Sequence, residues 1–443
     1  MNSLMKRCLL LALSSLLMTA ATAQLPYSRQ MVESLSLQDF TNNRNHSTLA
    51  TADFSYVPGL VAKSVLATYR LYPDQDGYWQ QIKAYADRQL TGDAERPVRI
   101  GDNDIDAINA GKIFFDLYSV SLEKGDVASA AKYKEAATYM YRKLKTQHTR
   151  IQAPLPGAGG FIHKGKYPDQ MWLDGLYMGA AFLAGWEATF GTPDDQAGWA
   201  DIALQFKTIH RYTWDKKKKL NYHAWSANPT DPNSFWANQK KPHLGCSKEF
   251  WARGCGWYFA ALADVLEVMP QDHPDYKALV KIFRQVAQGL ARRQSESGSW
   301  YQLLQYDENM TGDGIGDLSG GRRYNIGTAP NYLESSASGM FTYAYLKGLR
   351  LGLLDEKTYL PVATKAWQGL LDNFIRPNPD GSISIIQSCA SAGLGPAKNP
   401  GRTGTANYYL CGGDTGITQN EGKAIGSFTL AACEYERLMM RRK

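Results

Sequence analysis

Two aspartates stand in settings that could support acid–base chemistry. Asp174, in the segment MWLDGLYM, follows Trp172 and lies among apolar residues. A carboxyl group there would be partly desolvated, which favours its protonated form and suits it to donate a proton. Asp106, in NDIDAINAG, offers a second carboxyl group, whereas Asp102 and Asp104 are more simply explained as loop or cap residues. Paired carboxyl groups commonly break glycosidic bonds, although an aspartate at a helix start can also be an ordinary cap.

Arg253, in FWARGCGWY, could hold an acidic group. A guanidinium can grip a carboxylate with two parallel hydrogen bonds, and Trp251 and Trp257 on either side could stack on sugar rings. A buried structural arginine among core tryptophans is the alternative. His163 and His223 lie on loops expected between helices, and their spacing matches no metal-binding pattern. We therefore expect neither a metal nor an organic cofactor, and GxSxG, P-loop and dinucleotide motifs are also missing from the sequence.

A weak internal repeat indicates which elements position these residues. Six segments each place a glycine before an apolar run, as expected of a helix that is buried on nearly all sides. The glycines are Gly59, Gly111, Gly175, Gly256, Gly339 and Gly426. The intervals hold more amphipathic helices, which are clearest at 128–144, 199–212, 276–293 and 357–373. Six inner and six outer helices predict an all-α fold, an (α/α)6 barrel of six helical hairpins.

The repeat also predicts where the candidate site lies. The inner helices of such a barrel run parallel to one another, so their N-terminal ends meet at one mouth. The residues just before the repeat glycines should converge there, and they are Tyr56, Asn109, Trp172, Asp174, Arg253 and Ser336. Helix capping would explain the small polar members of this set but not Tyr56, Trp172 and Arg253.

The N-terminus and the charge balance narrow the class of protein. Residues 1–23 carry Lys6, Arg7, a short apolar run and a small-residue site ending at Ala23, which predict a signal peptide and an exported protein, periplasmic or extracellular. A membrane anchor is the alternative.

Residues 24–443 contain no linker or low-complexity block, so we expect a single catalytic barrel domain. Removing the two positive charges of the signal peptide leaves 47 basic against 42 acidic residues, or +5. This mild excess suits an acidic oligosaccharide better than nucleic acid, and no later stretch predicts membrane insertion.

Five cysteines follow the predicted signal peptide, and none forms a CxxC pair. In an exported protein, Cys389 and Cys411 could close a bridge across a loop. The odd number of cysteines leaves at least one thiol unbridged.

Three segments, GGFIHKGKYPDQMWLDGLYM, FWARGCGWYFAAL and ESSASGMFTYAYLKG, resemble glycoside hydrolase family 105, the unsaturated rhamnogalacturonyl hydrolases. The resemblance runs from about Tyr56 to the C-terminus and is weaker in NYYLCGGDTGITQNEGKAIGSF; Cys255 stands where the family motif would have asparagine. It implies a six-hairpin barrel, with Asp174 as proton donor and Asp106 as second essential carboxylate. The substrate-binding residues it implies are Tyr56, His163, Trp172, His223, Trp251, Arg253 and Trp257.

The resemblance further implies removal of a terminal 4,5-unsaturated uronic acid from oligosaccharides made by polysaccharide lyases. Asp174 would protonate C4 of the double bond, and water would then add at C5. Asp106 would orient Asp174 and hold its proton through like-charge repulsion, while His223 could position the water. No cofactor is needed for this chemistry.

Several alternatives stay open from the sequence alone. An unsaturated galacturonyl group linked to rhamnose is the substrate that the resemblance favours. An unsaturated glucuronyl hydrolase acting on ulvan- or glycosaminoglycan-type oligosaccharides is the second possibility. A non-catalytic glycan-binding protein is a third, against which the presence of both Asp106 and Asp174 argues. An epimerase on the same barrel would call for more histidines at the mouth, and an inverting endoglucanase for a Glu/Asp pair and a long cleft. The oligomeric state is not indicated.

Overall fold

The computed structural model describes residues 25–192, 195–310, 315–317, 323–325 and 330–442. The predicted signal peptide, 1–23, lies outside these residues. Within the described part of the chain, no helix is both long enough and apolar enough to cross a membrane.

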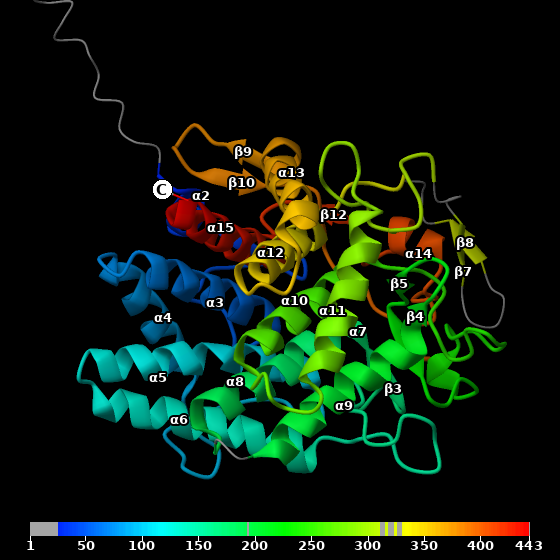
Figure 1. Cartoon of the computed structure of the whole chain (residues 1–443), viewed down its shortest axis with the longest axis horizontal. Coiled ribbons are helices and arrows are strands. Elements are labelled where there is room, and N and C mark those ends of the chain that lie inside the picture. Colours follow the sequence, from blue (N-terminus) through cyan, green and yellow to red (C-terminus); the bar gives the residue numbers. More distant parts are fainter. Residues whose placement is uncertain (1–24, 193–194, 311–314, 318–322, 326–329, 443) are drawn as a thin grey trace, which may run out of the picture.

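Six inner helical units form a closed ring. In chain order they are α3 (Tyr56–Leu71), η1 with α5 (Ile105–Lys112 and Ile113–Glu123), α7 with η3 and α8 (Leu173–Gly175, Leu176–Ala180 and Ala181–Phe190), α10 (Ala252–Val268), α12 (Ser335–Arg350) and α15 (Gly422–Arg442). Each unit packs against the next, and α15 returns to α3 (Figure 1). These helices are buried on most sides, and every residue from Ser335 to Gly348 of α12 is buried.

Six outer helices cover this ring. They are α2 (Tyr27–Ser34), α4 (Asp76–Gln89), α6 (Val127–Arg142), α9 (Gln196–Thr213), α11 (Tyr276–Ala291) and α13 (Glu356–Phe374). Each presents one apolar face inward; in α11 that face holds Leu279, Ile282, Phe283 and Val286, which follow helical spacing. The described helices thus confirm the predicted all-α (α/α)6 barrel, and the four outer helices predicted by range begin and end within a few residues of their expected bounds.

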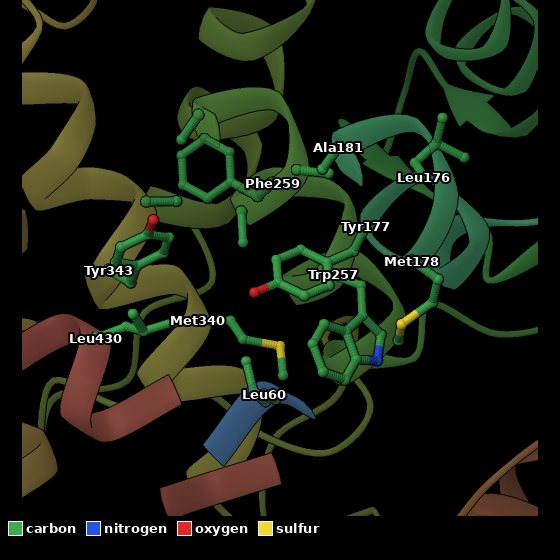
Figure 2. Packing of buried hydrophobic residues seen from close by; sticks show 14 of the residues in the cluster. Leu60, Leu176, Tyr177, Met178, Ala181, Trp257, Phe259, Met340, Tyr343 and Leu430 are labelled. Atoms are coloured by element: carbon green, nitrogen blue, oxygen red, sulfur yellow. The ribbon is translucent and has the colours of Figure 1, made fainter. Parts of the chain in front are cut away.

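The repeat glycines allow the inner helices to approach one another closely. A Cβ atom on Gly59 would lie 2.5 Å from the Cα of Ala110 on the neighbouring unit, and a Cβ atom on Gly339 would lie 2.5 Å from Ser427 Oγ on α15. Contacts this short leave no room for a side chain at Gly59 or Gly339. A Cβ atom on Gly175 would lie 3.6 Å from its nearest neighbour, so close packing does not account for every repeat glycine. Around the ring interior, Leu60, Tyr177, Trp257 and Met340 pack into one apolar cluster (Figure 2).

The remaining elements are short and lie in the connections between helices. The described strands form two-stranded antiparallel pairs. The pairs are β1 with β2 (Phe40–Asn42, Asn45–Ser47), β3 with β6 (Gln170–Trp172, Ala224–Ser226), β4 with β5 (Trp214–Asp215, Leu220–Asn221), β7 with β8 (Ile315–Asp317, Arg323–Asn325), β9 with β10 (Ile375–Pro377, Ile383–Ile385) and β11 with β12 (Ser388–Cys389, Ile417–Thr418). Three further short helices are η2 (Lys143–Gln147), η4 (Pro232–Ser234) and α14 (Ala406–Cys411).

The possible bridge between Cys389 and Cys411 is not formed. Cys389 is a free, buried cysteine whose thiol donates to the carbonyl oxygen of Ser391 at 3.3 Å. Its backbone carbonyl has a separate role, because it accepts a hydrogen bond from Arg253.

Candidate active site

A cavity of about 180 Å³ lies at the N-terminal ends of the inner helices. Eight of the nine residues proposed from the sequence line it, namely Tyr56, Asp106, His163, Trp172, Asp174, Trp251, Arg253 and Trp257. Most of them stand at or just before the start of an inner helix, as the repeat predicted. The other two members of the predicted convergent set contact this group: Asn109 donates to the backbone carbonyl of Tyr56, and Ser336 Oγ accepts from Arg253.

Asp174 lies in the wall of the cavity with a histidine directly behind it. A hydrogen bond of 3.0 Å joins Asp174 Oδ2 and His223 Nε2. The pairing of β3 with β6 brings the two segments together, and the backbone N–H of Leu173 donates to the carbonyl of His223. His223 is fully buried, and its other ring nitrogen, Nδ1, is hydrogen-bonded to the hydroxyl of Tyr409 at 2.7 Å. The sequence had placed His223 in the substrate pocket beside a water; the structure places it behind Asp174 with both nitrogens occupied.

Asp106 is held by a lysine that the sequence analysis did not single out. Lys164 Nζ lies 2.7 Å from Asp106 Oδ2 and 3.0 Å from Asp104 Oδ1. Burial lowers the pKa of Lys164, but the carboxylates of Asp106 and Asp104 outweigh this effect and raise the pKa above its ordinary value. The lysine offsets much of the negative charge of Asp106, so simple like-charge repulsion between Asp106 and Asp174 is not what the structure provides. Asp106 Oδ1 is buried without a hydrogen-bond partner among the described residues.

An aromatic wall faces these carboxyl groups. The ring of His163 stacks on Trp172 with centroids 4.3 Å apart, and Tyr167 packs against Trp172 at 4.6 Å. Burial lowers the pKa of His163 to about 3, so the ring is neutral at ordinary pH. His163 therefore contributes a flat surface rather than a positive charge. Such a wall suits the face of a sugar ring.

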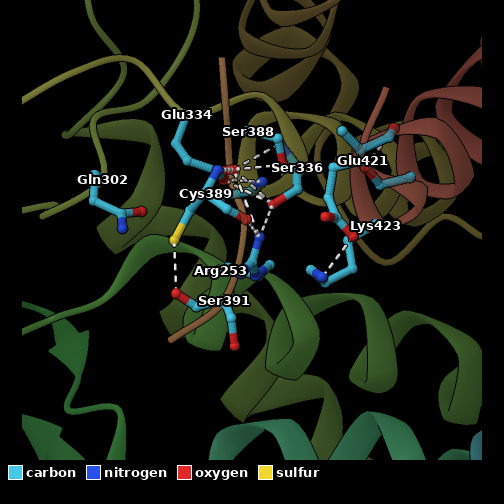
Figure 3. Close-up of polar contacts among 12 residues, drawn as sticks. Arg253, Gln302, Glu334, Ser336, Ser388, Cys389, Ser391, Glu421 and Lys423 are labelled. Atoms are coloured by element: carbon cyan, nitrogen blue, oxygen red, sulfur yellow. Dashed lines mark hydrogen bonds and ion pairs between the residues drawn. The ribbon is translucent and has the colours of Figure 1, made fainter. Parts of the chain in front are cut away.

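Arg253 is both buried and part of the cavity wall. Its guanidinium is 2% exposed and lies 5.0 Å from the centroid of the Trp251 ring. Nη1 donates to the carbonyl of Cys389 at 2.6 Å and to Ser336 Oγ at 3.2 Å, and it lies 3.8 Å from Glu334 Oε1 (Figure 3). Arg253 is thus held by interactions within the protein, and its side chain also lines the cavity.

Cys255, the departure from the family motif, is buried in α10. Its thiol donates to the carbonyl of Asn221 in β5 at 3.3 Å, and burial raises the pKa of the thiol to about 12.

Nine residues of the cavity wall were not predicted from the sequence, and four of them are cationic. The cationic residues are Lys164, Lys166, Arg402 and Lys423, and the others are Asn43, Tyr167, Met178, Ser391 and Ala392. A signal for Lys423 was present, because it stands three residues before Gly426, as Tyr56 and Arg253 stand three before their own glycines. Arg402 gave no such signal, since it lies on a loop that only the folded chain brings to the cavity.

The charges of these residues favour an acidic ligand. Lys423 is paired with Glu421 at 2.6 Å and Arg402 with Asp414 at 2.5 Å, while Lys166 is exposed and forms no ion pair with an acidic side chain among the described residues. The cavity thus combines two carboxyl groups, an aromatic wall and a cationic rim. The described residues contain no group of three or more side chains placed to hold a metal ion.

The helical barrel and this cavity define a carbohydrate-active enzyme of the glycosidase class. The family model for Glycosyl Hydrolase Family 88 matches residues 27–313 and 325–439, and the chain belongs to this family. A solved glycoside hydrolase from family 105 of C. acetobutylicum ATCC 824 is 32% identical, with a TM-score of 0.76 over 93% of this chain and 100% of that chain. The resemblance stated from the sequence motifs is therefore confirmed.

Two characterised relatives are similar over shorter stretches. The unsaturated rhamnogalacturonyl hydrolase YesR of Bacillus subtilis (strain 168) is 25% identical over 344 residues, which cover 77% of this chain and 80% of the relative. The unsaturated 3S-rhamnoglycuronyl hydrolase of Formosa agariphila is 29% identical over 247 residues, which cover 55% of this chain and 56% of the relative.

Proposed function

We propose that this glycosidase removes a terminal 4,5-unsaturated uronic acid from lyase-generated oligosaccharides, by hydration of the C4=C5 bond. The observation that carries the proposal is the pair of differently supported carboxyl groups in one small cavity: Asp174 backed by His223, and Asp106 held by Lys164. The cavity is about the size of one sugar ring, which favours attack at a chain end. Its cationic rim supports a uronic acid as the bound sugar.

In the proposed reaction, Asp174 first donates its proton to C4 of the unsaturated ring. The π electrons of the double bond form the new C4–H bond, and positive charge develops at C5, where the ring oxygen stabilises it. The resulting carboxylate of Asp174 then accepts a proton from a water molecule whose oxygen adds to C5. The product is a hemiketal at C5, which opens by breaking the bond between C5 and the ring oxygen. Opening gives a C5 ketone and leaves C1 as a hemiacetal, and the hemiacetal collapses to an aldehyde and releases the leaving sugar as an alcohol.

The other residues of the cavity bind and orient the substrate in this proposal. Asp106, with its Oδ1 unsatisfied in the wall, would accept a hydrogen bond from a sugar hydroxyl. Trp172 and Trp251 would pack against the sugar face, and Arg253 would present the outer edge of its guanidinium to the uronate.

We propose an unsaturated galacturonyl group linked to rhamnose as the preferred substrate, supported by the B. subtilis relative. An unsaturated glucuronyl group on an ulvan- or glycosaminoglycan-type oligosaccharide is the second candidate, supported by the F. agariphila relative, an unsaturated 3S-rhamnoglycuronyl hydrolase, and by the exposed Lys166 at the cationic rim. We further propose that the protein is exported, on the basis of residues 1–23.

The test is a screen of lyase digests of rhamnogalacturonan, homogalacturonan, ulvan and glycosaminoglycans for loss of near-ultraviolet absorbance. The conjugated double bond absorbs there, so a hydratase bleaches the signal and a glycan-binding protein leaves it intact. Reaction in ¹⁸O-labelled water should place label at C5, and reaction in heavy water should leave one deuterium at C4. Label at C1 alone, or turnover of a saturated uronoside, would contradict the mechanism.

A further inference from the structure

The hydrogen-bonded chain behind Asp174 ends in a residue from the far end of the sequence. Tyr409 lies in the short helix α14, 186 residues after His223, and its hydroxyl meets His223 Nδ1 at 2.7 Å. His223 Nε2 meets Asp174 Oδ2 at 3.0 Å. Both Tyr409 and His223 are fully buried, so water does not compete for these contacts. The three side chains are thus hydrogen-bonded in series, from the buried Tyr409 through His223 to Asp174 in the cavity wall.

The position of Tyr409 is fixed independently of His223. Its backbone carbonyl accepts a hydrogen bond from Gln302 Nε2 at 3.2 Å, and Gln302 Oε1 accepts one from Trp251 Nε1. The ring of Tyr409 also stacks on Trp251 at 5.9 Å between centroids. The hydroxyl is therefore aimed at His223 by the same tryptophan that forms the cavity wall.

The two tautomers of His223 make different hydrogen bonds with Tyr409 and Asp174. A neutral imidazole carries one N–H, and the tautomer is set by what each ring nitrogen faces. With the proton on Nε2, the ring donates to Asp174 Oδ2, and the hydroxyl of Tyr409 donates to Nδ1. With the proton on Nδ1, Nε2 carries no proton, and its lone pair faces Asp174 Oδ2. That lone pair either repels a carboxylate or draws the acid proton of Asp174 onto Oδ2, away from the cavity.

Tyr409 keeps its own proton, as this role demands. Burial raises the pKa of Tyr409 well above its ordinary value, and the negative charges of Tyr408, Asp174, Glu249 and Cys389 in their ionised forms add to the effect. The hydroxyl therefore remains available as a donor across the ordinary pH range.

We propose that Tyr409 is a positioning residue that holds His223 in its Nε2–H tautomer and so keeps the transferable proton of Asp174 on Oδ1, the oxygen left for the substrate. This proposal rests on the proposed function, in which Asp174 is the proton donor. It assigns a role to the C-terminal segment, where the family motifs are weakest.

Tyr409→Phe tests the proposal because it removes the hydroxyl and little else. We expect kcat for an unsaturated disaccharide to fall about tenfold or more, from the loss of one buried hydrogen bond that acts on the proton donor, with KM within about twofold. Tyr258→Phe is the matched control, since Tyr258 is equally buried and its hydroxyl has no hydrogen-bond partner among the described residues. This control should leave kcat unchanged. Unchanged kcat in Tyr409→Phe would overturn the proposal.

The tautomer itself can be observed in the wild-type protein without any substrate. In protein labelled with ¹⁵N-histidine, the His223 signals are identified by their absence from His223→Gln, and their shifts and couplings report which nitrogen carries the proton. We expect Nε2–H in the wild type and loss of that single form in Tyr409→Phe. An Nδ1–H form in the wild type would overturn the proposal even if Tyr409→Phe folded poorly. Failure of the wild type to bleach any lyase digest would instead count against the proposed function, with the tautomer result standing on its own.

Discussion

At the scale of single residues, the two carboxyl groups of the cavity differ in what surrounds them. Asp106 is paired with the ammonium group of Lys164 at 2.7 Å. Asp174 is hydrogen-bonded to the imidazole of His223 at 3.0 Å, and Trp172 packs edge-on against that imidazole. In the proposed reaction one residue must donate and later accept a proton, and an imidazole can hydrogen-bond to that residue in both steps. We therefore propose the acid–base role for Asp174 and a binding role for Asp106.

Asp174→Asn should retain the fold and abolish most of the activity. The amide has the same shape and can still hydrogen-bond His223, but it cannot donate a proton to C4 or accept one from water. General acid–base catalysis contributes about 10²–10⁴-fold, and here one residue serves two steps. Bleaching assays on the purified variant, with its thermal unfolding as the control for folding, check this. Activity above about a tenth of the wild-type value would show that Asp174 is not the proton donor.

Arg253→Lys should raise KM about tenfold or more, while kcat changes less. A lysine keeps the positive charge next to Glu334 but cannot bind the Cys389 carbonyl and a substrate carboxylate at the same time, because it lacks the planar fork. Initial-rate kinetics on the unsaturated disaccharide separate the two constants. An unchanged KM would mean that Arg253 only supports the wall and does not contact the substrate.

At the scale of elements, several of the repeat glycines let neighbouring inner helices pack at close range. The residue three positions earlier, such as Tyr56, Arg253 or Lys423, is then carried to the mouth of the barrel. The packing glycine and the residue at the mouth belong to one short segment, so a change in the first should disturb the second.

Gly59→Ala should destabilise the protein by about 1–3 kcal/mol, because the new methyl group would lie 2.5 Å from a backbone atom of Ala110. Gly77→Ala is the control, since it lies in the outer helix α4 with no atom within 4 Å of its added Cβ. We expect that substitution to be neutral or to stabilise by up to about 1 kcal/mol. Urea unfolding of both variants measures the difference. Equal stability of the two variants would contradict the packing role of Gly59.

At the scale of the whole molecule, the end of the barrel opposite to the cavity holds a network of ion pairs. Lys347 on α12 is 4% exposed and lies 2.6 Å from both Asp264 and Glu267 on α10. Arg350 continues the network to Glu267 and to Glu434 on α15. Three neighbouring inner helices are thus joined by ion pairs. Removing one partner of a buried pair leaves an uncompensated charge, which is costly.

Lys347→Met should therefore destabilise the protein by about 3–5 kcal/mol. Lys83→Met breaks the more exposed pair with Asp87 on the outer helix α4 and should cost about 0.5 kcal/mol or less. Thermal or urea unfolding of both variants checks the contrast. A loss in Lys347→Met no larger than that in Lys83→Met would show that the network contributes little to stability.

The same network predicts how stability depends on pH. Burial alone would raise the pKa of Glu267, but the charges of Lys347 and Arg350 lower it to about 2. Because the unfolded chain binds the proton more readily, the stabilisation is present above the ordinary glutamate pKa of about 4.3 and is lost as the pH falls toward 2. Unfolding midpoints measured between pH 6 and 2 should fall most steeply over that interval, and less steeply in Lys347→Met. A midpoint independent of pH in this range would contradict the prediction.

The sequence by itself determined the helical barrel and most of the cavity wall, because both depend on local patterns. Apolar runs that follow a glycine identify buried helices, and the residues before each glycine must lie at one mouth whenever those helices run parallel. The repeat predicted that Tyr56, Trp172, Asp174 and Arg253 lie at the mouth, and these four residues line the cavity. The cavity is also lined by residues proposed from their motifs and from the family resemblance, namely Asp106, His163, Trp251 and Trp257. Only the tertiary structure decided the contacts between segments that are distant in the chain. In the folded chain Lys164 pairs with Asp106, Tyr409 hydrogen-bonds to His223, and Arg402 lies at the rim of the cavity. Cys389 is a free cysteine whose backbone carbonyl accepts a hydrogen bond from Arg253. No periodicity encodes such contacts, because they depend on how loops and short strands fold over the end of the barrel. The residues that hydrogen-bond to a carboxyl group often come from such distant segments. The chemistry of Asp174 could therefore be proposed from the sequence, but the residues that position it could not.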